Sequence, residues 1–305
     1  MQIGIAGLGR MGMNMALRLM RGGHTVCCYN RTISKAHELA RQGARAADTP
    51  AQLIDMLTPP RVLWLMLPSG EATREHIERF AGLLSPGDIL VDGSNSFFKD
   101  DFAHRDLLAP MNIHYLDAGV SGGIWGLENG YCTMIGGERS DFEHIEPLLK
   151  TLAPENGYLY CGPCGAGHFT KMIHNGIEYA MMQAYGEGFA LLESSPYRDH
   201  LRFDEIAALW NRGSVIRSWL LELLEAALAG NATLDGLEPF VDDSGEGRWT
   251  VLQAVESGTP APVIAQALFE RYASRGHADF SRKILAALRN QFGGHAVKKT
   301  ETPNT

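Results

Sequence analysis

Short apolar segments alternate with longer amphipathic segments over the first half of the chain. The apolar segments have the composition of strands buried on both faces, and we expect strands at residues 1–7, 25–29, 62–67, 88–92, 114–117 and 131–135. Between them, apolar residues recur at helical spacing, and we expect helices at residues 11–21, 71–84 and 141–152. This alternation is typical of parallel βαβ units and predicts a doubly wound α/β domain with a parallel sheet.

The pattern changes near residues 161–165, where strand-like segments end and helical periodicity takes over. We expect the later helices at residues 167–193, 203–229, 247–256, 262–274 and 280–292. The sequence therefore predicts an α/β domain at residues 1–164, an all-helical domain at residues 165–297 and a polar, flexible tail at residues 298–305.

Composition and charge exclude several classes of protein. The 305 residues are 45% hydrophobic and 20% charged, enough apolar surface for packed cores and too much for a disordered chain. The net charge of −8 argues against a nucleic-acid partner, because binding to phosphates needs a surface rich in Lys and Arg. The longest purely apolar run, residues 62–67, is too short to cross a bilayer, and the start of the chain does not resemble a secretory signal. With five scattered cysteines, we expect a cytoplasmic protein without a disulfide framework.

A glycine-rich turn lies between the first predicted strand and the first predicted helix. Gly7, Gly9 and Gly12 form the pattern G-x-G-x-x-G, with Arg10 and Met11 between the last two glycines. Such a turn lets backbone N–H groups approach a pyrophosphate at the helix N-terminus. A purely structural turn is the alternative, but the strand and helix around it favour a Rossmann-like dinucleotide site.

The end of the second predicted strand bears on the choice of cofactor. Sites that prefer NAD usually carry an acidic residue here to bind the ribose hydroxyls. This chain has Asn30, Arg31 and Thr32, and the guanidinium can donate to a 2′-phosphate. We therefore expect NADP, with NAD possible, although Arg31 can also be read as an ordinary surface residue. Further cofactor contacts are expected from Leu67 and Asn95.

The first long helix after the boundary carries a polar stripe where a core stripe is usual. Lys171, His174, Asn175, Glu178 and Tyr179 are spaced at i, i+3, i+4, i+7 and i+8. An exposed face more often repeats Glu and Lys, whereas this stripe combines an amine, an imidazole, an amide, a carboxyl and a phenol. The combination predicts a site for acid–base chemistry, with a solvated helix face as the alternative.

Two loops at the ends of predicted strands are candidates to face that stripe. Residues 92–96 follow one strand, and residues 120–123 (Val-Ser-Gly-Gly) follow another. Open α/β sheets bind ligands at this edge, although either segment can be a plain turn.

Cys161 and Cys164 match the C-x-x-C pattern of thiol oxidoreductases. They lie at the predicted domain junction, and a zinc site needs about four ligands, usually from two such pairs. We expect neither a redox role for the pair nor a metal site.

With these motifs together, the chain resembles the decarboxylating 6-phosphogluconate dehydrogenase family, in its shorter bacterial form, within the β-hydroxyacid dehydrogenase superfamily. The string from Lys171 to Tyr179 is the most specific part, and the glycine turn is shared by the whole superfamily. The resemblance covers most of residues 1–297, and its other segments are residues 30–32, 92–95, 120–123, 247–250, 269–272 and 289–295.

The resemblance implies oxidation and decarboxylation of 6-phospho-D-gluconate to D-ribulose 5-phosphate and CO2, a step of the pentose phosphate pathway. Lys171 would be the general base and Glu178 the general acid, with His174 and Asn175 beside them. The residues implied to bind the substrate are Asn95, Ser121, Gly122, Gly123, His174, Asn175, Tyr179, Arg271, Arg289 and His295. A homodimer or homotetramer is implied, in which the C-terminal tail completes the site of a neighbouring subunit.

One departure affects the expected phosphate contacts. Longer family members carry Lys-Gly-Thr-Gly-Lys-Trp-Thr where this chain has Ser244 and Glu246 in place of the first lysine and the threonine. The phosphate is then held differently, or the preference for it is weaker. The nearest rival is another β-hydroxyacid dehydrogenase acting on a small hydroxy acid or semialdehyde; an NADP-binding sensor and a thiol oxidoreductase are more distant.

Overall fold

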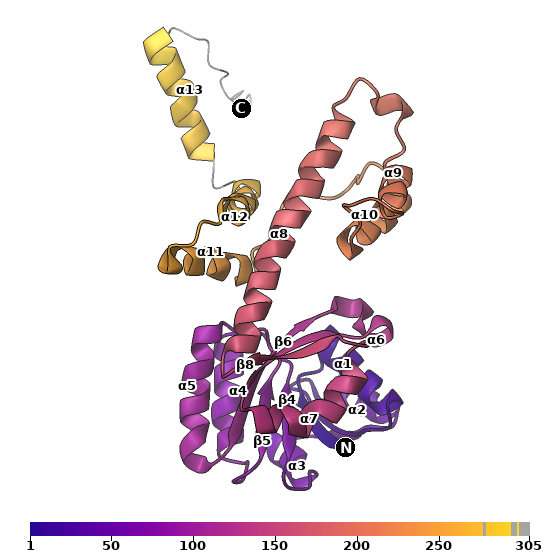
Figure 1. Cartoon of the computed structure of the whole chain (residues 1–305), viewed down its shortest axis with the longest axis vertical. Coiled ribbons are helices and arrows are strands. Elements are labelled where there is room, and N and C mark those ends of the chain that lie inside the picture. Colours follow the sequence, from indigo (N-terminus) through magenta and orange to yellow (C-terminus); the bar gives the residue numbers. More distant parts are fainter. Residues whose placement is uncertain (277–278, 294–297, 299–305) are drawn as a thin grey trace, which may run out of the picture. The chain divides into compact units, whose positions relative to one another are not determined.

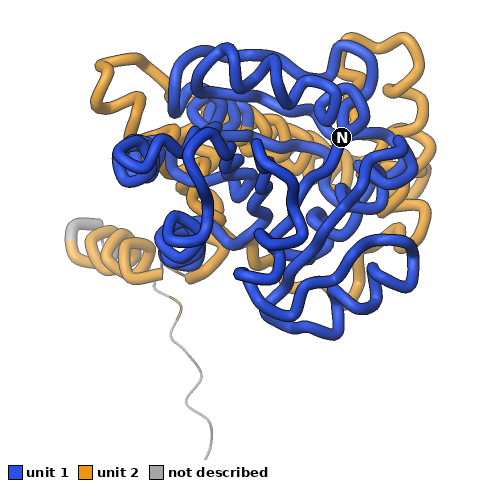
Figure 2. The backbone as a smooth tube through the Cα atoms, turned by 90° about the horizontal axis from the view of Figure 1, so that it is seen from below, with its two compact units in different colours: residues 1–174 blue, residues 175–305 orange. Residues whose placement is uncertain are grey.

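The computed structural model describes residues 1–276, 279–293 and 298. It divides the chain into two compact units, residues 1–174 and residues 175–305, coloured blue and orange in Figure 2.

The first unit is built on one eight-stranded sheet with the order β3-β2-β1-β4-β5-β6-β7-β8. Neighbouring strands are parallel except β6 and β7, which are antiparallel. The strands are β1 (Gln2–Ala6), β2 (Thr25–Tyr29), β3 (Arg45–Ala47), β4 (Val62–Leu65), β5 (Ile89–Asp92), β6 (His114–Ser121), β7 (Cys132–Gly137) and β8 (Tyr158–Gly162).

Helices cover both faces of the sheet, as the buried apolar strands require (Figure 1). Successive strand residues point to opposite faces, so Cys28 packs in one core and Cys27 in the other. The first core is closed by α1 (Arg10–Arg21), α2 (Ile33–Ala40) and α7 (Arg139–Leu152). The second is closed by α3 (Pro50–Asp55), α4 (Glu71–Ala81) and α5 (Phe98–Leu108). The doubly wound α/β fold is thereby confirmed.

The predicted parallel sheet has one antiparallel pairing, between β6 and β7. The strand expected at residues 114–117 continues to Ser121, and only the short segments η2 (Gly123–Trp125) and α6 (Gly126–Asn129) precede β7. A parallel crossover needs about a dozen residues or more, so this short connection returns the chain antiparallel.

Several elements of this unit were not expected from the sequence. They include β3, β8, α2, α3, α5 and α6. β3 is only three residues long and begins at exposed Arg45, while the edge strand β8 is only partly buried, so neither has the continuous apolar run of a central strand.

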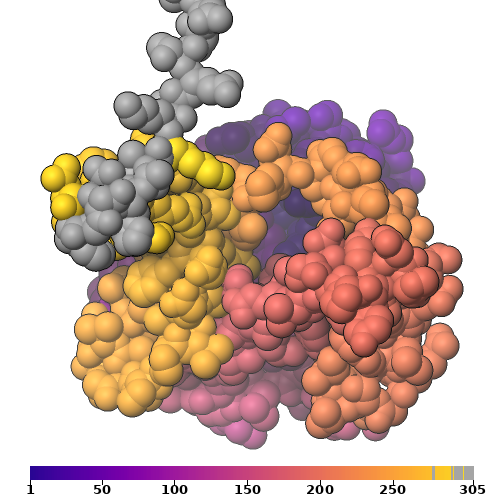
Figure 3. Space-filling view, turned by 90° about the horizontal axis from the view of Figure 1, so that it is seen from above, coloured from indigo at the N-terminus to yellow at the C-terminus, as the bar shows by residue number. Residues whose placement is uncertain are grey.

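The second unit is helical, as expected, and follows the long helix α8 (Ala166–Glu193), which begins in the first unit. The later helices are α9 (Phe203–Trp210), α10 (Trp219–Gly230), α11 (Glu246–Ser257), α12 (Pro262–Ser274) and α13 (Asp279–Gly293), with the short 3₁₀ turn η3 (Arg198–His200) before α9. α9 and α10 lie on one side of α8, and α11 and α12 on the other (Figures 1 and 3).

The single helix expected at residues 203–229 is wrong, because the structure has two helices there. Gly213 adopts a positive φ of 82° after α9 ends. The side chain of Ser218 then caps α10 by accepting from Leu221 N, so the chain stops and restarts its helix.

Among the helices of the described residues, none combines the length and the hydropathy needed to span a membrane.

Candidate functional site

The glycine-rich turn lies where the strand order changes direction. β1 pairs with β2 on one side and with β4 on the other, so the carboxyl end of β1 is a topological switch point. Gly7 adopts φ +102°, and a Cβ there would lie 2.3 Å from Met66 O. A Cβ on Gly12 would lie 2.1 Å from Gly7 O. Both positions therefore require glycine for the turn to close.

The N-terminus of α1 fits the pyrophosphate of a dinucleotide. Its N-cap, Gly9, offers no side-chain hydrogen bond, and the first turn contains no acidic residue. A Cβ built on Gly9 would meet nothing within 4 Å, so the backbone there is open to a ligand. Gly9 to Gly12 would hold the pyrophosphate through N–H groups at the positive end of the helix, with exposed Arg10 beside it.

Asn30 supports the turn instead of projecting from it. Its Oδ1 accepts from Leu8 N at 2.8 Å, and its Nδ2 donates to Thr32 O at 3.0 Å. Both ends of the amide are thus engaged with backbone. Arg31 and Thr32 are exposed on the segment that leads into α2. Among the three residues expected near the ribose, Arg31 is therefore the one whose charge can attract a 2′-phosphate.

The remaining expected cofactor contacts follow β4 and β5. Leu67 is half-buried after β4, and its N–H donates to Ser94 Oγ at 3.3 Å. Asn95 has a positive φ of 53° and forms two hydrogen bonds with the backbone of Val120. Its Nδ2 donates to Val120 O at 3.1 Å, and its Oδ1 accepts from Val120 N at 2.8 Å. This pair of bonds joins the loop after β5 to the end of β6.

Lys171 is buried against the sheet at the start of α8. Only 5% of its surface is exposed. A Cβ added to Gly119 of β6 would lie 2.4 Å from Lys171 Cβ, so the missing side chain leaves room for the lysine stem. The amine Nζ lies 3.5 Å from His174 Nδ1, and His174 Nε2 lies 3.5 Å from Ser121 Oγ. The first unit therefore brings together Ser121 of the loop after β6 with Lys171 and His174 of the polar stripe.

Gly122 and Gly123 continue the same loop with positive φ values of 143° and 53°. They follow β6 directly, beyond Ser121, and lead into the short helix α6.

Within the second unit, the residues expected to meet a phosphate form a second cluster. The Arg271 guanidinium lies over the Tyr179 ring, with its central carbon 3.5 Å from the ring centroid. Tyr179 Oη lies 3.1 Å from Ser244 Oγ, which in turn donates to Glu246 Oε2 at 2.5 Å. Arg271 also donates to Asp242 O at 2.8 Å. The Ser244 hydroxyl therefore links the Tyr179 hydroxyl to the carboxylate of Glu246.

The other predicted residues have separate positions. Asn175 is buried and Glu178 half-buried on α8, four and seven residues after Lys171 and therefore on the same helical face. Arg289 is exposed on α13. His295 lies outside the described residues.

Sequence reasoning gave no role to three buried acids of the first unit, Asp92, Asp101 and Asp117. All three are completely buried, and Asp92 of β5 and Asp117 of β6 are partners in the strand register. Acidic residues at matching positions of two predicted neighbouring strands were the available signal. Asp101, on a helix absent from the prediction, gave none.

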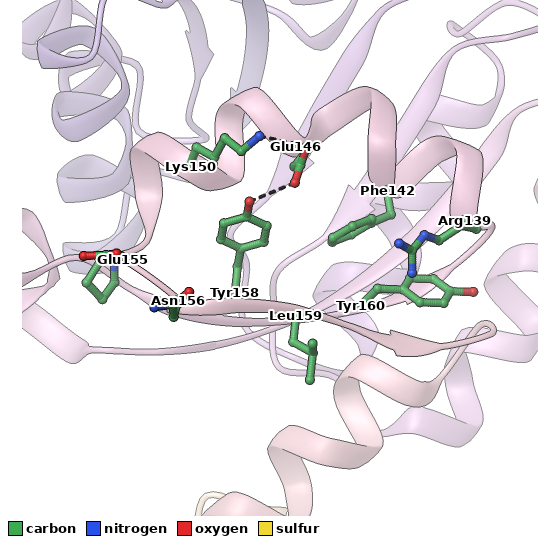
Figure 4. Close-up of a pocket in the computed structure, with 10 residues that line it drawn as sticks. Arg139, Phe142, Glu146, Lys150, Glu155, Asn156, Tyr158, Leu159 and Tyr160 are labelled. Atoms are coloured by element: carbon green, nitrogen blue, oxygen red, sulfur yellow. Dashed lines mark hydrogen bonds and ion pairs between the residues drawn. The ribbon is translucent and has the colours of Figure 1, made fainter.

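Two cavities lie away from these residues. One, of about 490 Å³, is lined by α7, β8 and the turn between them; there Tyr158 Oη donates to Glu146, and Arg139 lies against the Tyr160 ring (Figure 4). The other, of about 750 Å³, is largely apolar and lies among α8, α9 and α10. Neither is lined by a predicted site residue.

The C-x-x-C cysteines have hydrogen bonds of their own. Cys161 Sγ donates to Leu159 O, and Cys164 Sγ donates to Asp101 O. Burial raises the pKa of both thiols, that of Cys164 to about 12. A raised pKa disfavours the thiolate that redox chemistry needs.

Comparison with known proteins gives concordant matches for both parts of the chain. Residues 2–162 match the family model of the NAD binding domain of 6-phosphogluconate dehydrogenase, and residues 167–304 match that of the 6-phosphogluconate dehydrogenase C-terminal domain. A putative 6-phosphogluconate dehydrogenase of Bacillus subtilis, YqeC, is 44% identical over 98% of this chain and 100% of its own length. An NAD(+)-dependent, decarboxylating 6-phosphogluconate dehydrogenase of Haloferax volcanii is 39% identical over 99% of this chain and 100% of its own length.

Longer relatives and solved structures extend the comparison. An NADP(+)-dependent, decarboxylating 6-phosphogluconate dehydrogenase of B. subtilis is 34% identical over 90% of this chain, which spans 61% of that protein. The structure of Plasmodium falciparum 6-phosphogluconate dehydrogenase, described with NADP+ and with 6-phosphogluconate, has a TM-score of 0.84 at 28% identity, covering 100% of this chain and 67% of its own. Mycobacterium tuberculosis 3-hydroxyisobutyrate dehydrogenase, with a TM-score of 0.72 at 22% identity over 91% of this chain and 94% of its own, shares the fold.

Proposed function

Because the chain belongs to the 6-phosphogluconate dehydrogenase family of NAD(P)-dependent decarboxylating oxidoreductases, we propose that it converts 6-phospho-D-gluconate to D-ribulose 5-phosphate and CO2. The observation that carries the proposal is the position of Lys171. Its amine is buried in the first unit beside the His174 imidazole, at the carboxyl edge of a sheet with a dinucleotide turn. A buried amine next to a second basic group is the arrangement expected of a lysine base.

Lys171 begins the reaction as the general base. Its neutral amine takes the proton of the C3 hydroxyl while the C3 hydrogen leaves with its electron pair. A nicotinamide, when bound, supplies the acceptor for that hydride. The product is a ketone β to the carboxylate, which accepts the electrons released when CO2 leaves. The decarboxylation is therefore driven by the substrate's own carbonyl.

The same amine serves the second step in its protonated form. Lys171 donates its proton to the enolate oxygen as the bond to the carboxylate breaks, which gives the enediol. Glu178 then protonates the carbon that becomes C1 of ribulose 5-phosphate, while Lys171 takes back the enediol proton. General acid–base assistance of this kind contributes about 10²–10⁴-fold for each group.

The remaining residues divide between the two ends of the sugar acid. Near the carboxylate and inner hydroxyls we place Asn95, Ser121, Gly122, Gly123, His174 and Asn175. The distal phosphate is assigned to Tyr179, Arg271 and Arg289, and a hydroxyl to His295. Support for the phosphate end comes from the stacking of Arg271 on Tyr179.

We assign residues 1–164 to cofactor binding and residues 165–297 to substrate binding and subunit contact. NADP is the proposed cofactor for two reasons. Arg31 is an exposed cation just after β2, and position 30 is Asn where sites that prefer NAD usually have an acidic residue. Relatives are named for dependence on either NAD+ or NADP+, so NAD remains an alternative.

A homodimer or homotetramer is part of the proposal, with the C-terminal tail of one subunit completing the site of another. Support comes from α13, whose apolar side chains remain exposed. Phe280, Ile284, Leu285 and Leu288 are exposed by 75%, 44%, 62% and 54% of their surface.

Steady-state kinetics with 6-phosphogluconate test the reaction directly. Purified enzyme should reduce NADP and release one CO2 for each NADPH formed. Lys171→Met should lower kcat by at least about 10³-fold, because it removes the base, while NADP affinity measured by calorimetry stays within about twofold. The matched control is Lys150→Met, at an exposed lysine on α7, which should leave kcat unchanged.

Two results would contradict this function. One is turnover of 3-hydroxyisobutyrate or a small semialdehyde in preference to 6-phosphogluconate, which would favour the rival β-hydroxyacid dehydrogenase. The other is retained activity in folded Lys171→Met, which would assign the proton transfer to another group.

A further inference from the structure

Three buried acids of the first unit, Asp92, Asp101 and Asp117, take no direct part in the proposed chemistry. We refer to them as the buried acid cluster. The exposed fraction of each is 0%. Burying a carboxylate is unfavourable unless hydrogen bonds or an opposite charge compensate it. The partners of these three acids therefore show what they hold in place.

Asp92 organises the loop that carries Asn95. Its Oδ1 accepts from Ser94 N at 2.9 Å, and its Oδ2 accepts from Ser96 Oγ at 2.8 Å. Tyr115 Oη lies 3.3 Å from the same Oδ2 and donates to Asp101 Oδ1 at 2.8 Å. The loop after β5 is thereby connected to Asp101 on α5 through one phenol.

Asp117 and Asp101 hold the first turn of α8. Asp117 accepts from Gly165 N at 2.7 Å and from His168 N at 2.9 Å, as an N-capping carboxylate does. The side chain of His168 is also held, because its Nδ1 lies 2.9 and 3.0 Å from the two oxygens of Asp101. The backbone of His168 is therefore bound to Asp117 of β6, and its side chain to Asp101 of α5.

The carboxylate of Asp101 favours the protonated form of the His168 imidazole. Burial lowers its pKa, but the charge and hydrogen bond of Asp101 outweigh burial and raise it to about 10. His168 Nε2 is buried and has no hydrogen-bond partner among the described residues. The ring is therefore held by one side only, through its ion pair with Asp101.

Asp101, Asp117 and His168 are close enough together to hold a metal ion. The carboxylates of Asp101 and Asp117 are instead bound by the N–H and O–H donors named above, so hydrogen bonding already accounts for the positions of these two acids.

Lys171 follows His168 by three residues, about one helical turn, on α8. The turn between them packs directly on the sheet, where a Cβ on Gly167 would lie 2.4 Å from Met134 O and one on Gly119 2.4 Å from Lys171 Cβ. A small rotation or shift of this turn would therefore displace the lysine. Displacing a catalytic group by 1 Å can cost about 10²-fold in rate.

We propose that His168 and Asp101 are positioning residues, whose buried ion pair locks the first turn of α8 and so places Lys171 for proton transfer. Neither residue contacts substrate in this assignment. The expected loss of kcat rests on the proposed function. The expected displacement of Lys171 rests only on the geometry of α8.

The test compares Asp101→Asn and His168→Gln with the unmodified protein. Both variants keep side-chain volume close to the original and remove the ion pair. In each, kcat with 6-phosphogluconate should fall by about 10²-fold, while KM and NADP affinity stay within about twofold. The double variant should lose no more activity than the worse single variant, because both changes break the same contact.

A matched control is His114→Gln. His114 Nδ1 lies 2.7 Å from Asp141 Oδ1, in a second His–Asp pair between β6 and α7. Loss of that pair should leave kcat unchanged. Tyr115→Phe removes a single hydroxyl from the cluster and should lower kcat by about threefold to tenfold; it tests the proposal if the other variants do not fold.

A second measurement separates this proposal from the proposed function. In protein labelled with [¹³Cε]lysine, the Lys171 signal is assigned by its loss in Lys171→Met, and its titration is followed by NMR. His168→Gln should shift that signal and its titration midpoint, whether or not the protein turns over 6-phosphogluconate. Unchanged Lys171 signals in folded His168→Gln and Asp101→Asn, or unchanged kcat in these variants of an active enzyme, would overturn the proposal. An inactive unmodified protein with a shifted Lys171 signal would contradict the proposed function alone.

Discussion

The side chains of the candidate site are held chiefly by backbone atoms. Asn95 is bound at both ends of its amide by Val120, and Asn30 by Leu8 and Thr32. Lys171 is placed by close packing on Gly119. Backbone positions are determined by the whole sheet, so these side chains are set in place before a ligand arrives. Preorganised groups of this kind lose less entropy on binding.

The proposed preference for NADP over NAD depends on one residue, Arg31. Replacing it with Ala should lower kcat/KM for NADP about tenfold, because the 2′-phosphate loses a charge-assisted donor in an exposed place. The value for NAD should not change, because NAD lacks that phosphate. Arg41→Ala, at another exposed arginine nearby in the sequence, is the control. Equal losses with both cofactors would show that Arg31 does not read the 2′-phosphate.

Glu178 is expected to act late in the reaction. Glu178→Gln keeps the size of the side chain but cannot donate a proton, so kcat should fall by about 10²-fold. Incorporation of solvent deuterium at C1 of the product should slow in parallel, while NADP affinity stays the same. Glu187→Gln, at an exposed position of the same helix, should behave like the unmodified enzyme. Deuterium incorporation at the original rate would exclude Glu178 as the acid.

At the scale of elements, one helix carries most of the candidate chemistry. α8 presents Lys171, Asn175 and Glu178 on one face, and its period alone predicted that grouping. The strands were predictable where they are central and apolar, as in β1 and β4. They were missed at the sheet edges, where β3 and β8 are short or partly exposed. An edge strand is defined by its partner, which local sequence does not describe.

The apolar stripe of α13 is predicted to mediate subunit contact. Changing both Leu285 and Leu288 to Glu should shift the protein toward monomer in sedimentation and light scattering, because charges replace the exposed apolar surface. Activity should fall as the monomer fraction rises if the C-terminal tail completes the site of a neighbouring subunit. Arg282→Ala, at an exposed charged residue of α13 outside the apolar set, should keep both assembly and activity. An unchanged oligomer in the double variant would remove α13 from the interface.

At the scale of the whole molecule, the candidate residues divide between two compact units joined by α8. Ser121, Lys171 and His174 belong to the first unit, and Glu178 and Tyr179 to the second. The first unit also contains the buried acid cluster, which makes its stability depend on protonation. Buried ion pairs couple the state of single protons to the stability of an entire unit.

The pH dependence of stability follows from His168. Its pKa is about 10 in the folded protein and near 6.5 in the unfolded chain, so between these values the unfolded state binds fewer protons. The free energy of unfolding should therefore fall as pH rises from about 7 to about 10. Urea denaturation across this range should show the decline in the unmodified protein and in His114→Gln, and a weaker one in His168→Gln. Parallel curves for all three proteins would mean that His168 is not charged in the fold.

The sequence by itself determined the features that depend on neighbours along the chain. These are the glycine turn between a strand and a helix, the polar stripe of α8, the change from α/β to helical organisation, and the family resemblance that these motifs carry. Only the tertiary structure decided the features that depend on distant segments meeting. Examples are the antiparallel course of β7, the use of Asn30 to support the turn, and the pairing of His168 with Asp101, 67 residues away. Helical period and turn chemistry act over a few residues, whereas a buried charge finds its partner only after the sheet has formed and excluded water.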